Sequence, residues 1–81
     1  MKAYVLLNTE LGKEPEVIKA IKGAKEIKNI FSLYGIYDII IEVEADTMEK
    51  VKEVVFSRIR RLENVKSTIT LITYGEPIQN P

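Results

Sequence analysis

The sequence contains no cysteine and no histidine. Their absence excludes disulfides, thiolate nucleophiles, most zinc sites and the usual general base near neutral pH. Lys and Arg number 12 and Asp and Glu also number 12, so the formal net charge is zero. No overall field therefore attracts nucleic acid or an anionic membrane surface. We expect a protein that is not an enzyme, that uses no metal or cofactor and that does not bind DNA directly.

Long apolar segments are also missing. No stretch approaches the roughly 18 apolar residues that indicate a membrane helix, and no charged segment followed by an apolar one resembles a signal peptide. The sequence thus predicts a cytoplasmic protein without a membrane partner. Its 81 residues suffice for one domain. A chain of this size buries only about 60–65% of its unfolded surface, so partners would add to its stability.

Hydrophobic periodicity and turn residues divide the chain into six elements. Alternating residues predict strands, and apolar residues three and four apart predict helices. Pro15 suits the first turn of the first helix, and Asp46 with Glu49 has the spacing of a capping box before the second. The predicted elements are a strand over 2–9, a helix over 14–23, a hairpin with arms 27–34 and 37–44, a longer helix after Asp46 that includes Met48 to Leu62, and a strand over 65–74. Residues 1–74 then form the domain and 75–81 a C-terminal tail.

The order β-α-β-β-α-β is that of a ferredoxin-like α+β sandwich. Right-handed crossovers would place both helices on one face of a four-stranded antiparallel sheet, with its first and third strands in the middle. The other face would be uncovered and half apolar, which indicates an oligomer interface. We expect this face to carry Tyr4, Leu6, Ser32, Tyr34, Asp38, Ile40, Glu42, Thr68, Thr70 and Ile72. Tyr4, Leu6, Ile40 and Ile72 are its predicted interface residues.

The hairpin turn carries more side-chain chemistry than a simple reversal requires. Gly35 supplies a positive φ angle or a close approach of a ligand to the backbone. Asp38 either accepts hydrogen bonds from a ligand ammonium or forms ordinary turn bonds. Tyr34 and Tyr37 either flank a pocket or serve as packing residues.

Outside the turn, Thr68 and Thr70 share one strand face, where their hydroxyls either bind a carboxylate and an amine or follow from simple strand propensity. Glu42 and Glu44 indicate salt bridges more than a metal site, because no other ligand type accompanies them. Three arginines, Arg58, Arg60 and Arg61, complement the end of the second helix. The basic Gly-aromatic signature of RNA-recognition modules is missing from the third strand.

Two motifs together give a family resemblance: Gly35-Ile36-Tyr37-Asp38 at the hairpin turn and Val65-Lys66-Ser67-Thr68-Ile69-Thr70 in the last strand. With the order of elements from Lys2 to Thr73, they make the chain resemble the effector domain of the Lrp/AsnC (feast/famine) transcription regulators, the RAM domain. Typical members begin with a helix-turn-helix, whereas this chain opens at its first strand and resembles a stand-alone effector domain. Many relatives also have a polar residue where this chain has Ile36.

The resemblance implies a homo-oligomer in which open sheet faces pack into dimers and dimers assemble into octamers or other rings. It implies an amino acid effector bound between dimers, which modulates regulators of amino acid metabolism, with full-length Lrp/AsnC relatives as further partners. The ligand contacts that it implies are Leu33, Tyr34, Gly35, Tyr37, Asp38, Thr68 and Thr70.

Two other functions fit the same architecture. One is a small dimeric enzyme of the monooxygenase or isomerase type, which rests on fold analogy alone. The other is a structural adaptor whose open sheet face binds a protein. Binding of an amino acid, turnover of a metabolite or neither would discriminate among the three.

Overall fold

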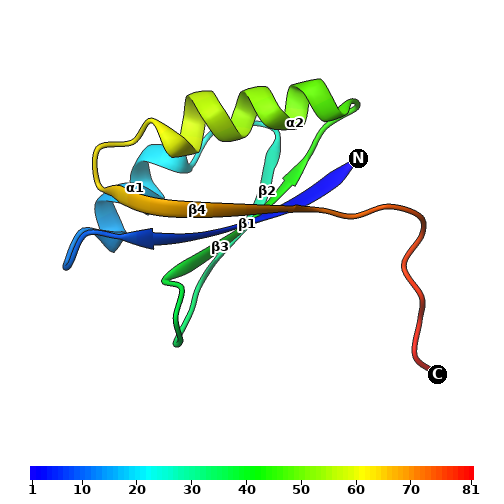
Figure 1. The fold of residues 1–81 in the computed structure, drawn as a ribbon, viewed down its shortest axis with the longest axis horizontal. Helices are drawn as coiled ribbons and strands as arrows, with labels where there is room; N and C mark the ends of the chain where they lie inside the picture. The colour runs from blue at the N-terminus through cyan, green and yellow to red at the C-terminus, as the bar shows by residue number, and fades with distance from the viewer.

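The computed structural model describes residues 1–81 and contains the predicted succession of strands and helices (Figure 1). Helices α1 and α2 lie on one face of the sheet, and a short π-helical segment, η1, continues α2. The elements are β1 (Lys2–Thr9), α1 (Glu14–Ile21), β2 (Ile27–Ser32), β3 (Ile39–Glu44), α2 (Met48–Val54), η1 (Val55–Arg60) and β4 (Val65–Ile72).

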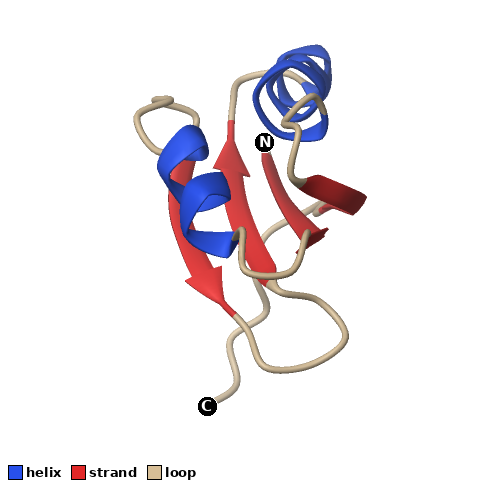
Figure 2. Cartoon of the chain, turned by 90° about the vertical axis from the view of Figure 1, so that its left-hand side faces the viewer, coloured by secondary structure: helices blue, strands red, loops and turns tan.

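The four strands form one antiparallel sheet in the order β2-β3-β1-β4. The first and third strands are central, as the sequence predicted, and the fold is the expected ferredoxin-like α+β sandwich (Figure 2). None of the helices has the length and apolarity that crossing a bilayer requires.

A single hydrophobic core fills the space between the sheet and the helices. Every second residue of β1 and β3 is buried on this side, and α1, α2 and η1 contribute the opposite wall. Such alternation is the period-2 pattern of a strand with one covered face. The core residues are Ala3, Val5, Leu7, Val17, Ile21, Ile39, Ile41, Val43, Val51, Val54, Val55 and Ile59.

The open face differs from the prediction at its two edge strands. Even-numbered residues of β1 stand beside odd-numbered residues of β4, so that Tyr4 lies beside Leu71 and Leu6 beside Ile69. A shift of one residue transfers every side chain of a strand to the other face. The face assignments of Thr68, Thr70, Ile72 and Ser32 were therefore wrong: the register places all four on the helix side. Ile72 packs against the core there instead of lying on the open face.

The apolar residues of the open face consequently come from all four strands. Central Tyr4, Leu6 and Ile40 are half-buried, as expected for this face. The edge strands contribute Phe31, Ile69 and Leu71, which the sequence had not been expected to place on this face. Phe31 lies there because β2 pairs it with Ile40 of β3. The complete set is Tyr4, Leu6, Phe31, Ile40, Ile69 and Leu71.

The second helix begins with a different cap from the one predicted. The Thr47 side-chain oxygen accepts a hydrogen bond from the Lys50 backbone N–H at 3.1 Å, so Thr47 is the N-cap, and Asp46 and Glu49 do not form the predicted capping box. Threonine is a good N-cap because its short side chain reaches back to the free N–H groups of the first turn. The π-helical end of this helix was not predicted either. Such wide turns are rare and often occur at functional sites.

Candidate functional site

The β2–β3 loop, residues 33–38, projects from the sheet on the side opposite to the helices (Figure 1). The Leu33 N–H donates to the Asp38 carbonyl at 2.9 Å, which closes the loop at its base. Gly35 has φ 150°. Tyr34 and Ile36 stand on either side of it at the tip, and both are exposed, Ile36 at 85%. The tip therefore presents two large apolar side chains that nothing in the chain covers.

Asp38 ties this loop to the central strand. Its Oδ2 accepts a hydrogen bond from the Thr9 backbone N–H at 2.8 Å and lies 3.4 Å from Thr9 Oγ1. Its own N–H donates to the Leu7 carbonyl at 3.0 Å. This arrangement is not local turn chemistry, because it joins residues 29 positions apart. Only Oδ2 is engaged, so Oδ1 can still accept a bond from a ligand.

A hollow of about 730 Å³, which we call the end hollow, lies beside Asp38 at this end of the sheet. It contains three carboxylates and a single lysine, so its charge suits a ligand ammonium. Ile36 is one of its two hydrophobic residues. The lining consists of Asn8, Thr9, Glu10, Leu11, Gly12, Glu14, Ile36, Asp38, Lys66 and Ser67.

A second hollow of about 600 Å³, which we call the side groove, lies between the second helix and β4. It contains two cations and two hydroxyls and no carboxylate, so its charge suits a ligand carboxylate. Neither cation forms a salt bridge within the chain. The lining consists of Lys52, Val55, Phe56, Arg60, Thr68, Thr70 and Ile72.

The structure therefore divides the predicted ligand residues into two groups. Asp38 lies at the end hollow, and Thr68 and Thr70 lie in the side groove, and no residue lines both. Leu33 and Tyr37 are half-buried, and Tyr34 and Gly35 are exposed in the loop. One chain does not bring these residues together in one cavity.

Three residues of the side groove were not predicted as site residues from the sequence. Lys52, Phe56 and Arg60 recur at intervals of four, which places them along one side of a helix, and this spacing was visible in the sequence. Arg60 had been assigned to complement the helix end together with its neighbours. In the structure it lines the groove opposite the two threonines.

Glu42 forms the polar centre of the open sheet face. Asn29 Nδ2 donates to Glu42 Oε1 at 2.8 Å, and Lys2 Nζ lies 3.2 Å from Glu42 Oε2. The hydrogen bond from Asn29, and then that from Lys2, lowers the pKa of Glu42, while the hydrogen bond to Glu42 raises the pKa of Lys2. The predicted salt-bridge role of Glu42 is thus confirmed. No group of three or more potential ligand side chains is arranged to hold a metal ion.

Comparison with known families decides what kind of domain carries these features. The family described as the Lrp/AsnC ligand binding domain matches residues 2–81. The chain belongs to this family. The resemblance seen in the two motifs is therefore confirmed, and the match extends over almost the whole sequence. No curated protein shows a significant match to the chain.

Two solved chains of similar length match this chain over at least 90% of each partner. FFRP-DM1 is 33% identical, with 90% of this chain and 97% of that chain covered and a TM-score of 0.86. The hypothetical protein PHS023 from Pyrococcus horikoshii is also 33% identical, with 93% and 90% covered and a TM-score of 0.84. E. coli AsnC, at 21% identity, shares the fold with a TM-score of 0.86, and the match covers 99% of this chain and 54% of AsnC.

Proposed function

We propose that this Lrp/AsnC ligand-binding domain binds a free amino acid and that occupancy controls the assembly of its oligomers. The observation that carries the proposal is the family match over residues 2–81. A more distant structural relative, the transcriptional regulator NMB0573 from Neisseria meningitidis, was solved as a complex with L-Met. At 14% identity, its TM-score of 0.84 shows a common fold. The amino acid class of the ligand is our extension to this chain.

The charges of the two hollows fit the two charged groups of an amino acid. The end hollow, with Asp38, offers carboxylates to an ammonium, and the side groove, with Arg60 and the two threonines, offers cations and hydroxyls to a carboxylate. Both groups of an α-amino acid are attached to one carbon atom. Two hollows that share no residue therefore hold one such ligand only if the end hollow of one copy meets the side groove of another. This geometry favours a site between copies of the chain.

The open sheet face provides the primary contact between copies. Its apolar residues, among them Tyr4, Leu6 and Ile40, lie uncovered in the isolated chain. Two such faces packed together would give a dimer with an apolar interior, and dimers would then meet through the loop and groove to form rings. A ligand at the second contact stabilises the assembled state in proportion to its preference for that state. Full-length Lrp/AsnC regulators could enter the same assemblies through the shared fold.

The decisive experiment combines calorimetry and light scattering with each of the twenty amino acids. We expect at least one of them to bind to the wild-type chain and to change its mass distribution. The double variant Thr68→Val/Thr70→Val keeps the shape of both side chains and should lose binding without unfolding. As a matched control, Ser57→Ala removes a hydroxyl that lies outside both hollows and donates only to the Glu53 carbonyl of its own helix.

Three outcomes would overturn the proposal. Absence of binding and of any mass change with all twenty amino acids would leave the adaptor function. Turnover of a tested metabolite would favour the enzyme. Unchanged affinity of the double threonine variant would remove the side groove from the site.

A further inference from the structure

The last eight residues, 74–81, form an arm that leaves the body of the domain (Figure 1). The last attachment is at Thr73, whose N–H and hydroxyl both donate to the Lys2 carbonyl, at 3.0 and 3.1 Å. No hydrogen bond holds the chain beyond this point. Two large apolar side chains of the arm are nevertheless fully uncovered, Tyr74 at 98% and Ile78 at 99%.

The whole chain exposes more surface than its mass requires. Its accessible surface is 6012 Å², and its mass is 9.3 kDa. A compact monomer of this mass exposes about 5,000 Å² by the usual scaling with molecular weight. The excess of about 1,000 Å² is close to the roughly 800 Å² that each partner contributes to a standard protein interface. All eight residues of the arm are exposed, so the uncovered arm accounts for much of this excess.

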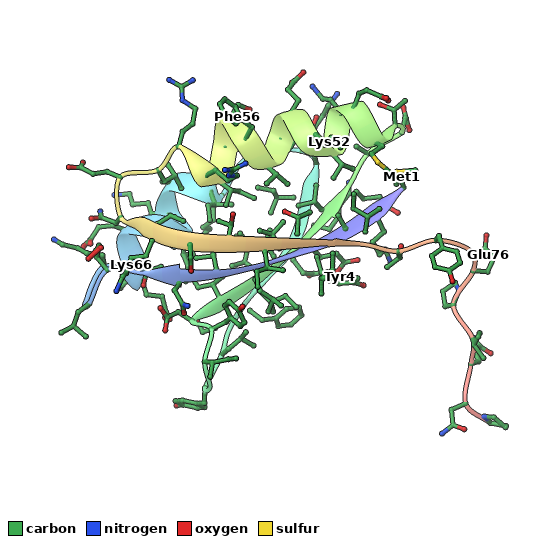
Figure 3. All side chains as sticks on the ribbon, viewed as in Figure 1. Met1, Tyr4, Lys52, Phe56, Lys66 and Glu76 are labelled. Atoms are coloured by element: carbon green, nitrogen blue, oxygen red, sulfur yellow. The ribbon has the colours of Figure 1, made fainter.

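Two segments extend from the same side of the molecule. The loop 33–38 and the arm both extend away from the helices, toward the side of the open sheet face, and the face lies between them (Figure 3). At the base of the arm, Met1, Tyr4 and Tyr74 help to line a hollow of about 800 Å³. A second copy seated on the open face would be flanked by the loop at one end and by the arm at the other.

The length of the arm matches the size of such a partner. Eight extended residues span about 26 Å. The shortest extent of the whole chain, arm included, is 19 Å, and a four-stranded sheet is about 15 Å wide between its outer strands. The arm runs away from its own sheet (Figure 1), and Gly75 within it has a positive φ of 73°. The arm can therefore cross the sheet of a neighbouring copy.

We propose that the arm, residues 74–81, crosses onto the second copy in the face-to-face dimer and anchors there through Tyr74 and Ile78. The inference rests on the dimer of the proposed function but does not involve the amino acid site. It assigns the C-terminal segment a role in holding the dimer together. Each copy gives one arm and receives one, because the symmetry of a dimer makes both contacts equivalent.

Sedimentation equilibrium of the full chain and of Ile78→Ser tests the anchor. Ile78 touches nothing in its own chain, so the variant should fold as the wild type does, with the same far-UV circular dichroism. The dimer buries two Ile78 side chains, one from each arm, so the variant should raise the dissociation constant about 100-fold or more. Gln79→Ser is the matched control, because Gln79 is the exposed polar neighbour of Ile78 in the same arm and lines neither the end hollow nor the side groove. It should leave the dissociation constant unchanged.

A spin label locates the arm, since the chain has no cysteine that would interfere. In a mixed sample, natural-abundance Ile78→Cys carrying a nitroxide is combined with isotope-labelled wild type. Broadening of wild-type amide signals around the open face would support a crossing arm, because the label and the observed nuclei belong to different copies.

The outcomes separate this inference from the proposed function. A wild-type chain that remains monomeric at all concentrations would overturn the dimer and the arm together. A dimer whose dissociation constant is the same in Ile78→Ser would overturn the arm alone. A tighter dimer in that variant would show that the arm covers its own sheet, which also contradicts the crossing.

Discussion

The Asp38 carboxylate holds the end of the central strand through the Thr9 backbone, with 2.8 Å between Asp38 Oδ2 and Thr9 N. Thr9 is the one buried polar residue of the domain. Its N–H would lose its partner if the carboxylate were removed, and an unsatisfied buried donor is costly. Asp38 therefore has a structural role, and a test of its ligand role must measure stability and ligand affinity separately.

Replacement of Asp38 by alanine and by asparagine should achieve this separation. Asp38→Ala removes the acceptor, and we expect the free energy of unfolding to fall by about 1.5–3 kcal/mol, the usual range for a bond to a charged group. Asp38→Asn keeps an oxygen for Thr9 and should cost less than half as much. Both variants lack the charge that would bind an ammonium, so both should lose amino acid affinity. Urea unfolding and calorimetry measure the two effects, and equal destabilisation by both variants would contradict this account.

Sequence patterns predicted the order of elements and the central strands because these depend on periodicity within each segment. They did not predict which face of β4 is open. Val65 to Ile72 alternates between a more apolar set, which includes Ile69 and Leu71, and a more polar set, which includes Thr68 and Thr70. Hydrophobicity alone assigns the apolar set to the core, whereas the pairing of Leu71 with Tyr4 places it on the open face. That register follows from contacts between segments. For the same reason the two motifs identified Asp38, Thr68 and Thr70 without revealing that they lie in separate hollows.

The cap of α2 provides a test of local structure. Thr47→Ala removes the oxygen that accepts from the Lys50 N–H, and the free energy of unfolding should fall by about 1 kcal/mol. Asp46→Ala should change it by less than about 0.5 kcal/mol, because Asp46 does not cap the helix. Thermal unfolding of both variants at one ionic strength makes the comparison. A larger effect at Asp46 than at Thr47 would restore the capping box that the sequence suggested.

The Glu42 network predicts a specific dependence of stability on pH. The pKa of Glu42 is lowered from its ordinary 4.5 when the chain folds, so the unfolded state binds protons first as the pH falls. Its contribution is therefore complete at neutral pH and is lost as the pH falls through the folded pKa. The pKa of Lys2 is raised from its ordinary 10.5, so the contribution of Lys2 to stability is lost only as the pH rises above 10.5.

Glu42→Gln should thus flatten the acid limb of the stability curve. Urea unfolding at a series of pH values between about 3 and 7 would show a smaller loss of stability in the variant than in the wild type. Glu44→Gln is the control, since Glu44 lies two residues along the strand and forms no salt bridge. An acid limb that is unchanged in Glu42→Gln, or equally changed in Glu44→Gln, would rule out the network as its source.

Substitution of Ile41 should lower the stability of the domain, whereas substitution of Ile36 should change ligand binding. Ile41 is completely buried at the centre of the core, whereas Ile36 is 85% exposed at the loop tip and lines the end hollow. Ile41→Ala leaves a cavity and should cost about 2–5 kcal/mol, a large part of the stability of a small domain. Ile41→Val, which should cost about 1 kcal/mol, keeps the measurement possible if the alanine variant unfolds. Ile36→Ala should leave the unfolding transition within about 0.5 kcal/mol and instead change the affinity for the amino acid. Loss of stability in Ile36→Ala would mean that the loop tip packs against the domain in solution, and its role at the end hollow would then have to be abandoned.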